Sequence, residues 1–343
     1  MRIIRPMNPS LSPSLFPGAI TDVAGLEVGH FTHSLRPTGC SVVLARAGAV
    51  AGVDVRGAAP GTRETDLLDP VNLVQQVHAI TLSGGSAWGL DAASGVMRWL
   101  EEQGIGLPTP YGQVPIVPGA VLFDLGVGDA RIRPDAQAGH QACVNASARA
   151  PAQGTVGVGA GALVGKLLGM ARAMKGGVGS ASLTVNGVTV GAMVACNAVG
   201  DVRHHETGQW LAGARNAEGT ALMNTQAALL QGQSPQALLA GTNTTIGVIA
   251  TNATLSKAQA KRLAQVGHDG LARTIYPVHT QLDGDTLFAL ATGQHSDAPD
   301  MLLLCTLAAE VTARAVVNAV MSAHSLQVGA QHWPAASELS AAA

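Results

Sequence analysis

The segment GTNTTIGVIATN, residues 241–252, joins a polar, turn-prone start to a run rich in β-branched residues. This composition predicts that Thr244 is the first residue of a strand that directly follows a tight turn. Taken alone, the pattern describes an ordinary junction between a loop and a strand. A threonine hydroxyl there becomes a nucleophile only if a base takes its proton, and the residue's own α-amino group, with a pKa of roughly 8, is one such base.

That base exists only at an N-terminus, because a peptide nitrogen cannot accept the proton. An internal threonine must therefore be released by cleavage of the preceding bond, and Asn243–Thr244 is the candidate bond. The Thr244 hydroxyl would attack the Asn243 carbonyl carbon, move the acyl group from nitrogen to oxygen and leave an ester that water hydrolyses. The residues alone leave self-cleavage and the ordinary junction open as alternatives.

Strand-like and helical segments are mixed on both sides of this segment. Asn186-Gly187 stands between two alternating runs and predicts a hairpin, and Ser256 is the expected N-cap of a helix. Hairpins combined with long apolar helices favour a layered α/β sandwich, in which helices cover antiparallel sheets, over a doubly wound parallel sheet. The predicted strands are 41–55, 78–84, 182–200, 244–252 and 286–293, and the predicted helices are 65–78, 86–103, 136–149, 206–230, 257–267 and 299–323.

The composition is that of a globular protein, because 47% of the 343 residues are hydrophobic and 12% are charged. The net charge is −2 without a basic block, which argues against a nucleic-acid partner. The apolar stretch 301–321 carries Glu310 and Arg314, so it predicts a buried amphipathic helix and not a membrane span. Prolines interrupt the first 20 residues, which do not resemble a secretory signal, and we expect a cytoplasmic location.

The ends of the chain differ in composition from its body. Residues 1–17 are rich in Pro and Ser, and residues 325–343 are small, polar and aperiodic. We therefore expect a loose N-terminal segment over 1–17, a single catalytic domain over 18–324 and a loose C-terminal tail over 325–343.

The sequence lacks complete patterns of the kind that metal or nucleotide sites require. Residues 157–162 fit a loose G-x-G-x-x-A, but no acidic residue follows about 20 positions later, where a ribose ligand is expected. His204-His205 is a close pair without the spacing of a zinc site. We expect neither a metal nor a cofactor. The cysteines stand singly in apolar settings, which is typical of small buried residues: Cys40, Cys143, Cys196 and Cys305.

Co-linear segments over the body of the chain carry a family resemblance: ITDVAGLEVGH at 20–30, DVRGAAPGTRETDLLDP at 54–70, HAITLSGGSAWGLDAASGV at 78–96, GTVGVGAGALVGK at 154–166, KGGVGSAS at 175–182 and ACNAVGD at 195–201. The chain resembles the self-processing D- and β-aminopeptidases typified by DmpA. Around Asn243 it is most similar to the nylon-oligomer (6-aminohexanoate oligomer) hydrolases. The resemblance implies an αββα sandwich like that of other N-terminal-nucleophile hydrolases, with DmpA-type connectivity and with neither metal nor organic cofactor.

The same resemblance implies an autoprocessing amide hydrolase, an aminopeptidase or amidase that forms an acyl-enzyme on Thr244. Its substrates would be small peptides or amide oligomers, including those of β- or ω-amino acids. In the family, the bond after an Asn is cut ahead of Ser or Thr, and Thr244 followed by Thr245 favours the nylon-oligomer branch. Cleavage would give an α chain, 1–243, and a β chain, 244–343, assembled as a homo-oligomer of α/β heteromers.

Individual residues match the family's site. Asp283 and Asp285 match the acidic pair beside the nucleophile, and an Asp-x-Asp on a strand points both carboxylates to one face. There they would hydrogen-bond the Thr244 hydroxyl. The alternative is a hairpin turn, for which Asp283-Gly284 is a favourable dipeptide. Asn197 matches the family's oxyanion donor, and Lys166 matches a lysine near the nucleophile.

Two aromatic residues are the candidates for the substrate pocket. Phe123 stands where the nylon-oligomer enzymes have a tyrosine, so a hydroxyl near the site is lost. Trp88, where relatives often have Phe, either lines the pocket or fills the core.

Two other functions stay open from the sequence. One is an acyltransferase of the ornithine-acetyltransferase type, a structural relative that also cuts itself before a threonine. The other is a non-catalytic binding or assembly protein on the same fold, against which the joint retention of Thr244, Asp283, Asp285, Lys166 and Asn197 argues.

Overall fold

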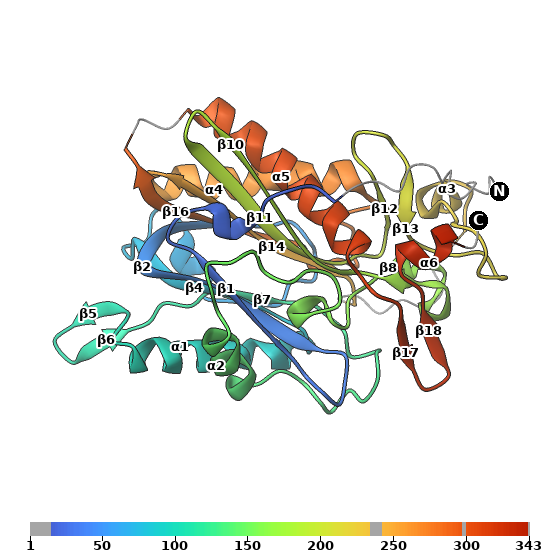
Figure 1. Cartoon of the computed structure of the whole chain (residues 1–343), viewed down its shortest axis with the longest axis horizontal. Helices are drawn as coiled ribbons and strands as arrows, with labels where there is room; N and C mark the ends of the chain where they lie inside the picture. Colours follow the sequence, from blue (N-terminus) through green and yellow to red (C-terminus); the bar gives the residue numbers. More distant parts are fainter. Residues whose placement is uncertain (1–14, 234–241, 297–299, 342–343) are drawn as a thin grey trace.

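A mixed sheet of nine strands forms the centre of the molecule (Figure 1). The computed structural model describes residues 15–233, 242–296 and 300–341. The strand order is β10-β11-β14-β16-β2-β4-β7-β3, with β1 paired to β2, and neighbours are antiparallel except for the parallel pairs β14–β16 and β4–β7. These strands are β1 (Glu27–Thr32), β2 (Gly39–Val55), β3 (Thr62–Arg63), β4 (Gln76–Ser83), β7 (Gly119–Val121), β10 (Gly177–Val185), β11 (Val188–Asn197), β14 (Thr244–Ala253) and β16 (Thr286–His295).

The sheet curls over itself along β2, a strand of 17 residues whose pairing with β4 shifts in register between Leu44 and Ala49. Ile246 and Val248 of β14 share a buried cluster with Ile80 of β4, although β16 and β2 stand between these strands in the sheet. Two layers of the sheet therefore face each other across a common apolar core.

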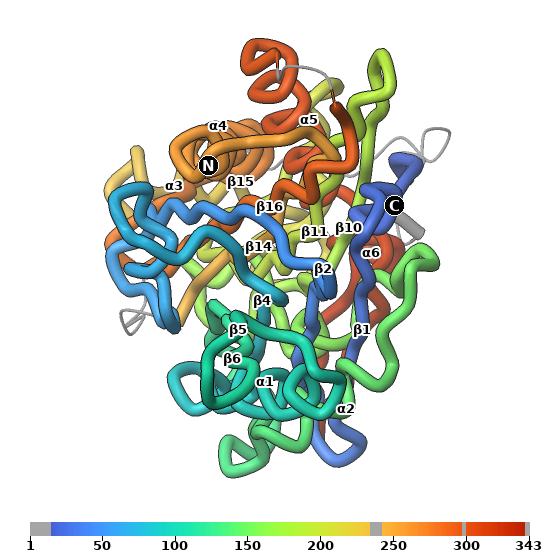
Figure 2. The backbone as a smooth tube through the Cα atoms, turned by 90° about the vertical axis from the view of Figure 1, so that its left-hand side faces the viewer, coloured from blue at the N-terminus to red at the C-terminus, as the bar shows by residue number. Residues whose placement is uncertain are grey.

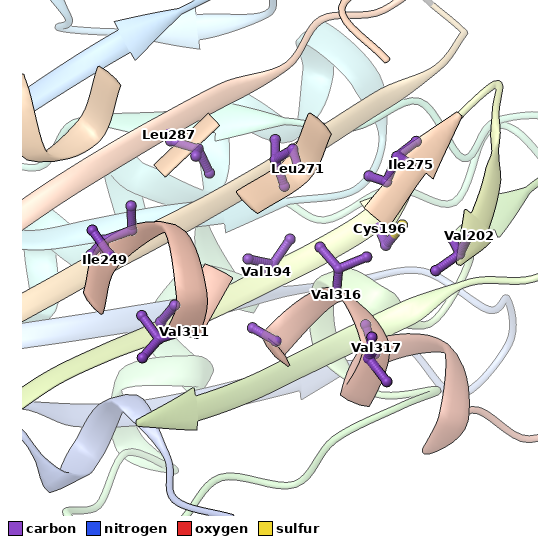
Figure 3. Packing of buried hydrophobic residues seen from close by; sticks show 14 of the residues in the cluster. Val194, Cys196, Val202, Ile249, Leu271, Ile275, Leu287, Val311, Val316 and Val317 are labelled. Carbon is purple, nitrogen blue, oxygen red and sulfur yellow. The ribbon is translucent and has the colours of Figure 1, made fainter. Parts of the chain in front are cut away.

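Helices cover the outer face of each layer (Figure 2). α4 (Lys257–Thr274) and α5 (Met301–Met321) cover one layer, where Val194 and Ile249 of the strands pack with Val311 and Val316 of α5 (Figure 3). α1 (Ala92–Glu102) and α2 (Ala136–Val144) cover the other layer, and their apolar side chains share a cluster with those of β2 and β4. The predicted αββα sandwich is confirmed.

The position of β14 between these layers follows from its residue pattern. Ile246, Val248 and Ala250 enter the central core, whereas Ile249 enters the core beneath α4 and α5. Successive side chains of a strand point to opposite faces, and a strand that is covered on both faces needs apolar side chains on both.

Two predicted local features agree closely with the structure. Asn186-Gly187 forms the turn between β10 and β11, and both residues have positive φ angles. Ser256 caps α4 through a capping box with Gln259, in which each side chain binds the other residue's backbone N–H.

Two predicted helices are wrong. The segment 65–78 contains only a short 3-10 turn at Asp66–Leu68 before β4 begins, because Asp69-Pro70 interrupts the apolar periodicity. The segment 206–230 forms a helix only at its end, since glycines with positive φ angles interrupt it at Gly208 and Gly219. The other strands and α-helices of the described residues are β5 (Leu107–Thr109), β6 (Gly112–Val114), β8 (Leu163–Val164), β9 (Met174–Lys175), β12 (Asp201–Arg203), β13 (Trp210–Ala212), β15 (Ile275–Tyr276), β17 (Leu326–Val328), β18 (Gln331–Trp333), α3 (Thr225–Leu230) and α6 (Ala336–Ala341).

The C-terminal segment differs from the loose tail that its composition predicts. β17 and β18 form a hairpin, α6 follows, and the Trp333 side chain is 1% exposed. The indole Nε1–H of Trp333 donates to the Met170 carbonyl at 2.8 Å. One aromatic residue thus anchors a segment whose aperiodic sequence gives no helix or strand signal. Most of the predicted loose N-terminal segment, residues 1–14, lies outside the described residues.

α5 is long and apolar enough to cross a membrane by length and composition, but 67% of its most apolar window is buried inside the fold. It packs against α4, β10 and β11. The buried helix that the sequence predicts at this position is confirmed.

Trp333→Ala should lower the free energy of unfolding by about 3 kcal/mol, because a large buried side chain leaves a cavity and the Met170 carbonyl loses its donor. Trp333→Phe, which keeps most of the ring volume, should cost about 1 kcal/mol. Urea unfolding measures both variants. A loss for the alanine variant no larger than for the phenylalanine variant would show that Trp333 does not anchor the tail.

Candidate active site

Thr244 is the first residue of β14, as predicted, and lies opposite Asn197, the last residue of β11. The parallel neighbour β16 begins at Thr286, so the start of β16 lies at the same edge of the sheet. Thr244 is 2% exposed and Asn243 is fully buried. The chain is continuous here, and the Thr244 hydroxyl donates to the Asn243 carbonyl oxygen at 2.5 Å.

The Asn243 carbonyl oxygen has a second donor, the backbone N–H of Gly284, at 2.9 Å. The loop that carries Gly284 also lies against the hydroxyl, since a Cβ on this glycine would stand 3.0 Å from Thr244 Oγ1. A backbone N–H aimed at a carbonyl oxygen stabilises negative charge that develops there. The carbonyl oxygen of the peptide bond before Thr244 therefore accepts two hydrogen bonds, one from the Thr244 hydroxyl and one from the Gly284 N–H.

Two buried carboxylates flank this bond. Asp285 accepts the Thr245 N–H at 2.6 Å on Oδ1, and its Oδ2 lies 2.8 Å from Nδ1 of His279. Asp283 accepts both the N–H and the hydroxyl of Thr280 on Oδ2, at 2.9 and 2.6 Å. Burial and the neighbouring Asp285 charge raise the pKa of Asp283 to about 6.

These carboxylates differ in two respects from the predicted geometry. They lie just ahead of β16 and not within a strand, and their hydrogen bonds go to backbone and side-chain groups around Thr244 instead of to its hydroxyl. The pair is therefore oriented by the loop residues His279 and Thr280 and by the Thr245 N–H of β14.

Lys166 and Asn197 form a second polar cluster on the other side of Thr244. The Lys166 Nζ donates to the Asn197 carbonyl and side-chain oxygens, at 2.9 and 3.0 Å, and to the Thr242 carbonyl at 2.9 Å. Burial lowers the pKa of Lys166 to about 7, against the opposing charge of Asp283. The Asn197 amide Nδ2 donates to the Phe123 carbonyl at 3.1 Å.

A cavity of about 170 Å³ opens beside this cluster. Its walls are mostly apolar, and Lys166 and Asn197 supply polar groups. The buried ion pair between Arg36 and Asp124, 2.9 Å long, fixes one wall, and Arg36 also donates to the Val127 carbonyl. The lining residues are Phe123, Asp124, Gly126, Val127, Gly161, Leu163, Lys166, Met170, Asn197 and Thr242.

The two aromatic candidates are placed differently. Phe123 lines the cavity. Trp88 lies outside it, is 58% exposed and packs against the Arg133 guanidinium at 4.2 Å, so it neither fills the core nor touches this pocket.

One group in the described part of the chain has the composition of a metal site: His205, Glu206 and Glu310. The Glu310 carboxylate, however, already binds the guanidinium groups of Arg314 and Arg273, at 2.9 and 3.0 Å. Two cations on its carboxylate make this group an ion-pair network rather than a cation site.

The comparisons with known proteins agree on one family. The sequence model of peptidase family S58 matches residues 18–333 of this chain. The chain belongs to peptidase family S58. This hydrolase acts on amide bonds, which favours neither the acyltransferase nor the non-catalytic alternative.

Among the relatives of this S58 hydrolase is an uncharacterized aminopeptidase of Mycobacterium leprae, 47% identical over 341 residues, with 90% of this chain and 91% of the relative covered. A 6-aminohexanoate-oligomer endohydrolase of Kocuria sp. is 32% identical over 277 residues, with 80% and 74% covered. The L-aminopeptidase D-Ala-esterase/amidase of Ochrobactrum anthropi has the same fold, with a TM-score of 0.69, 21% identity and 97% and 95% covered. A Burkholderia sp. β-aminopeptidase matches with a TM-score of 0.67 at 23% identity over 99% and 96% of the two chains.

The structure adds groups that the sequence analysis misses. The Gly284 N–H, the His279 ring and the Thr280 hydroxyl all bind the Asn243 carbonyl or the two carboxylates. They lie in or beside HTQLDGD, residues 279–285, so nearness in sequence to Asp283 is the signal that could have found them.

The two fully buried lysines predict how stability depends on pH. Burial lowers the pKa values of Lys166 and Lys175 to about 7, so between pH 7.5 and 8.5 the unfolded chain binds more protons than the folded one. The free energy of unfolding of an uncut Thr244→Ala chain should therefore rise with pH by about 1 kcal/mol for each lysine across this range.

Lys175→Met should remove about half of this rise, which urea unfolding at several pH values measures. Above this range, the buried thiols of Cys143 and Cys196, whose pKa values burial raises to about 12, oppose the trend. A stability that is flat or falls from pH 7.5 to 8.5 would mean that both lysines stay charged.

Proposed function

We propose that this chain cuts itself between Asn243 and Thr244, and that the freed Thr244 is the nucleophile that cleaves amide bonds in other molecules. One observation carries the proposal: the Thr244 hydroxyl and the Gly284 N–H both reach the Asn243 carbonyl oxygen, with two buried carboxylates beside them. An ordinary strand start needs none of these groups.

Self-cleavage follows from this arrangement. An ionised carboxylate of the Asp283–Asp285 pair takes the hydroxyl proton, and Oγ1 of Thr244 attacks the Asn243 carbonyl carbon. The Gly284 N–H stabilises the oxyanion, and the C–N bond breaks as the leaving nitrogen gains a proton. Breaking the C–N bond frees the Thr244 amine, and water then hydrolyses the ester to give the Asn243 carboxylate and the free Thr244 hydroxyl. Before the acyl shift the Thr244 nitrogen is still part of an amide and cannot accept a proton. The carboxylates must therefore serve as the base for self-cleavage.

Turnover of a substrate uses the same hydroxyl with a different base. The free α-amine of Thr244 titrates near neutral pH and accepts the hydroxyl proton. Asn197, which lies opposite Thr244 and lines the cavity, would donate its amide to the substrate oxyanion, and the buried Lys166 would favour the deprotonated hydroxyl. Oγ1 attacks the substrate carbonyl carbon, and the C–N bond breaks as the protonated Thr244 amine gives its proton to the leaving amine. Water then hydrolyses the acyl-enzyme and frees the acyl group as a carboxylate.

The substrates that this site favours are peptide-like amides, including those of β- or ω-amino acyl oligomers. The cavity beside Lys166 has Phe123, Val127, Leu163 and Met170 in its walls, which suits an acyl group with an apolar chain. The names of the relatives, an uncharacterized aminopeptidase and a 6-aminohexanoate-oligomer endohydrolase, refer to such bonds and support this choice.

The two fragments would stay together as an α/β heteromer after cleavage. β14 pairs with β11 on one side, and β16 pairs with β2 on the other, so the β chain occupies the middle of a sheet built by the α chain. Assembly of these heteromers into a homo-oligomer and a cytoplasmic location belong to the same proposal.

The purified protein should migrate as pieces of about 25 and 10 kDa, scaled from the 34.6 kDa chain to residues 1–243 and 244–343. Thr244→Ala should stay uncut, since the attacking oxygen is gone. Denaturing electrophoresis and N-terminal sequencing of the small piece check this. An intact chain with full amidase activity would contradict the proposal, and Thr245→Ala, which keeps the nucleophile, is the control.

Asp283→Asn and Asp285→Asn should each slow self-cleavage and turnover by roughly 10²-fold or more, because a positioned proton-transfer partner is lost. Asp201→Asn is the matched control: this aspartate is also buried but binds Thr225 and the Ala214 N–H away from Thr244. Gel densitometry of processing and an amide-release assay measure the rates. If both site variants kept the wild-type rates, Asp283 and Asp285 would have no role in proton transfer and would only form a turn.

A further inference from the structure

His279 contacts the Asp285 carboxylate in two ways. Its backbone N–H donates to Oδ2 at 3.1 Å, and its ring Nδ1 lies 2.8 Å from the same oxygen. Because an ionised carboxylate can only accept, Nδ1 carries the hydrogen in this contact. The residue holds a positive φ of 56°, a conformation that is unfavourable for a histidine and that places both groups on one oxygen.

The ring of His279 is itself held in place. The His268 ring of α4 packs against it edge-on, with ring centroids 4.8 Å apart. His268 Nε2 in turn lies 3.0 Å from the Asp54 carbonyl oxygen at the end of β2. Burial lowers the pKa of His268 to about 4, so this ring is neutral. α4 and the end of β2 thus fix the ring of His279, whose Nδ1 lies against the Asp285 carboxylate.

The charged groups around His279 come from three places. Its own loop supplies Asp285 and, beside it, Asp283. The end of β2 supplies Asp54 and the adjoining Arg56, which are paired with each other at 2.7 Å. From α4 comes His268, with Asp269 bound to Arg56 at 3.9 Å. Among the side chains that the structure describes, His279 is the one that donates to Asp285; the other donors to this carboxylate are backbone N–H groups.

We propose that His279 is a positioning residue that keeps Asp285 ionised and fixed at the start of β14, so that the proton shared by the acidic pair rests on Asp283. The proposal rests on the proposed function, in which the pair takes the Thr244 proton. Asp285 has three N–H donors, whereas Asp283 is held by one threonine, and hydrogen bonds to the charged form favour that form. The elevated pKa of Asp283, about 6, agrees with this division of roles.

The sign of the effect follows. Removing the Nδ1–H takes away a hydrogen bond that favours the ionised carboxylate, so the acidic pair takes up its second proton at a higher pH. The acid limb of the rate profile must then move to higher pH. A hydrogen bond to a charged group is strong enough to move this limb by about one pH unit.

The test uses three substitutions that all tolerate a positive φ. His279→Gly removes the ring and keeps the backbone N–H to Asp285. His279→Asn restores a side-chain N–H near the position of Nδ1, and His279→Asp has the same size as the asparagine but carries a like charge. Folding of each variant is checked by circular dichroism and thermal unfolding in the uncut Thr244→Ala chain.

Self-cleavage is measured from about pH 4, well below the Asp283 pKa of about 6, to pH 9 by gel densitometry of freshly refolded or newly synthesised precursor. The glycine variant should shift the acid limb upward by about one pH unit and cleave roughly tenfold slower at its lower end. The aspartate variant should shift the limb further. The asparagine variant should lie close to the wild type in both rate and limb. Because asparagine and aspartate share size and backbone preference, their difference measures the electrostatic contact and not the fold.

Two results would overturn the proposal. In one, the glycine, asparagine and aspartate variants all keep the wild-type acid limb, whatever their rates, which would make His279 a structural residue. In the other, His279→Gly still shifts the limb when Asp285→Asn is already present, which would mean that it does not act through Asp285. A failure of the proposed function is distinguishable, because Asp285→Asn alone would then cut itself at the wild-type rate.

Discussion

The backbone pairing of β14 with β11 and β16 is the interaction on which the site depends. It lays Thr244 opposite Asn197 and brings the loop before β16 to the same edge of the sheet. The peptide bond before Thr244 is then flanked on one side by the Asp283–Asp285 loop and on the other by Lys166. A slip of one residue in this register would turn Thr244 to the other face and separate these groups.

Burial gives these groups their chemistry. Desolvation disfavours charge, so it raises the pKa of Asp283 and lowers that of Lys166, which brings an acid and a base with very different ordinary values toward neutrality. Each buried charge is compensated by hydrogen bonds, several of them from backbone groups. The enclosing layers thus tune proton transfer as well as supplying stability, and loosening them would shift these groups back toward their values in water.

The sequence was most informative where local pattern and chemistry coincide. The run of β-branched residues after Thr244 predicts β14, the Asn186-Gly187 turn predicts a hairpin, and long apolar helices predict the outer layers. The resemblance points to the residues that the fold gathers around Thr244. What the sequence could not give depends on distant contacts: the Gly284 N–H is a backbone group without a side-chain signature, and the exposure of Trp88 depends on which loops cover it. Trp333 shows the same limit, since a single anchor leaves no periodicity.

The 17-residue strand β2 belongs to both layers of the sandwich, pairing with β16 in one and with β4 and β1 in the other. β2 runs without interruption from one layer into the other, so the two layers cannot be separated while this strand stays intact. Loss of either layer would leave part of β2 without its partner strands and expose the apolar core common to both. Because this strand is shared, a change that loosens one layer should also weaken the other.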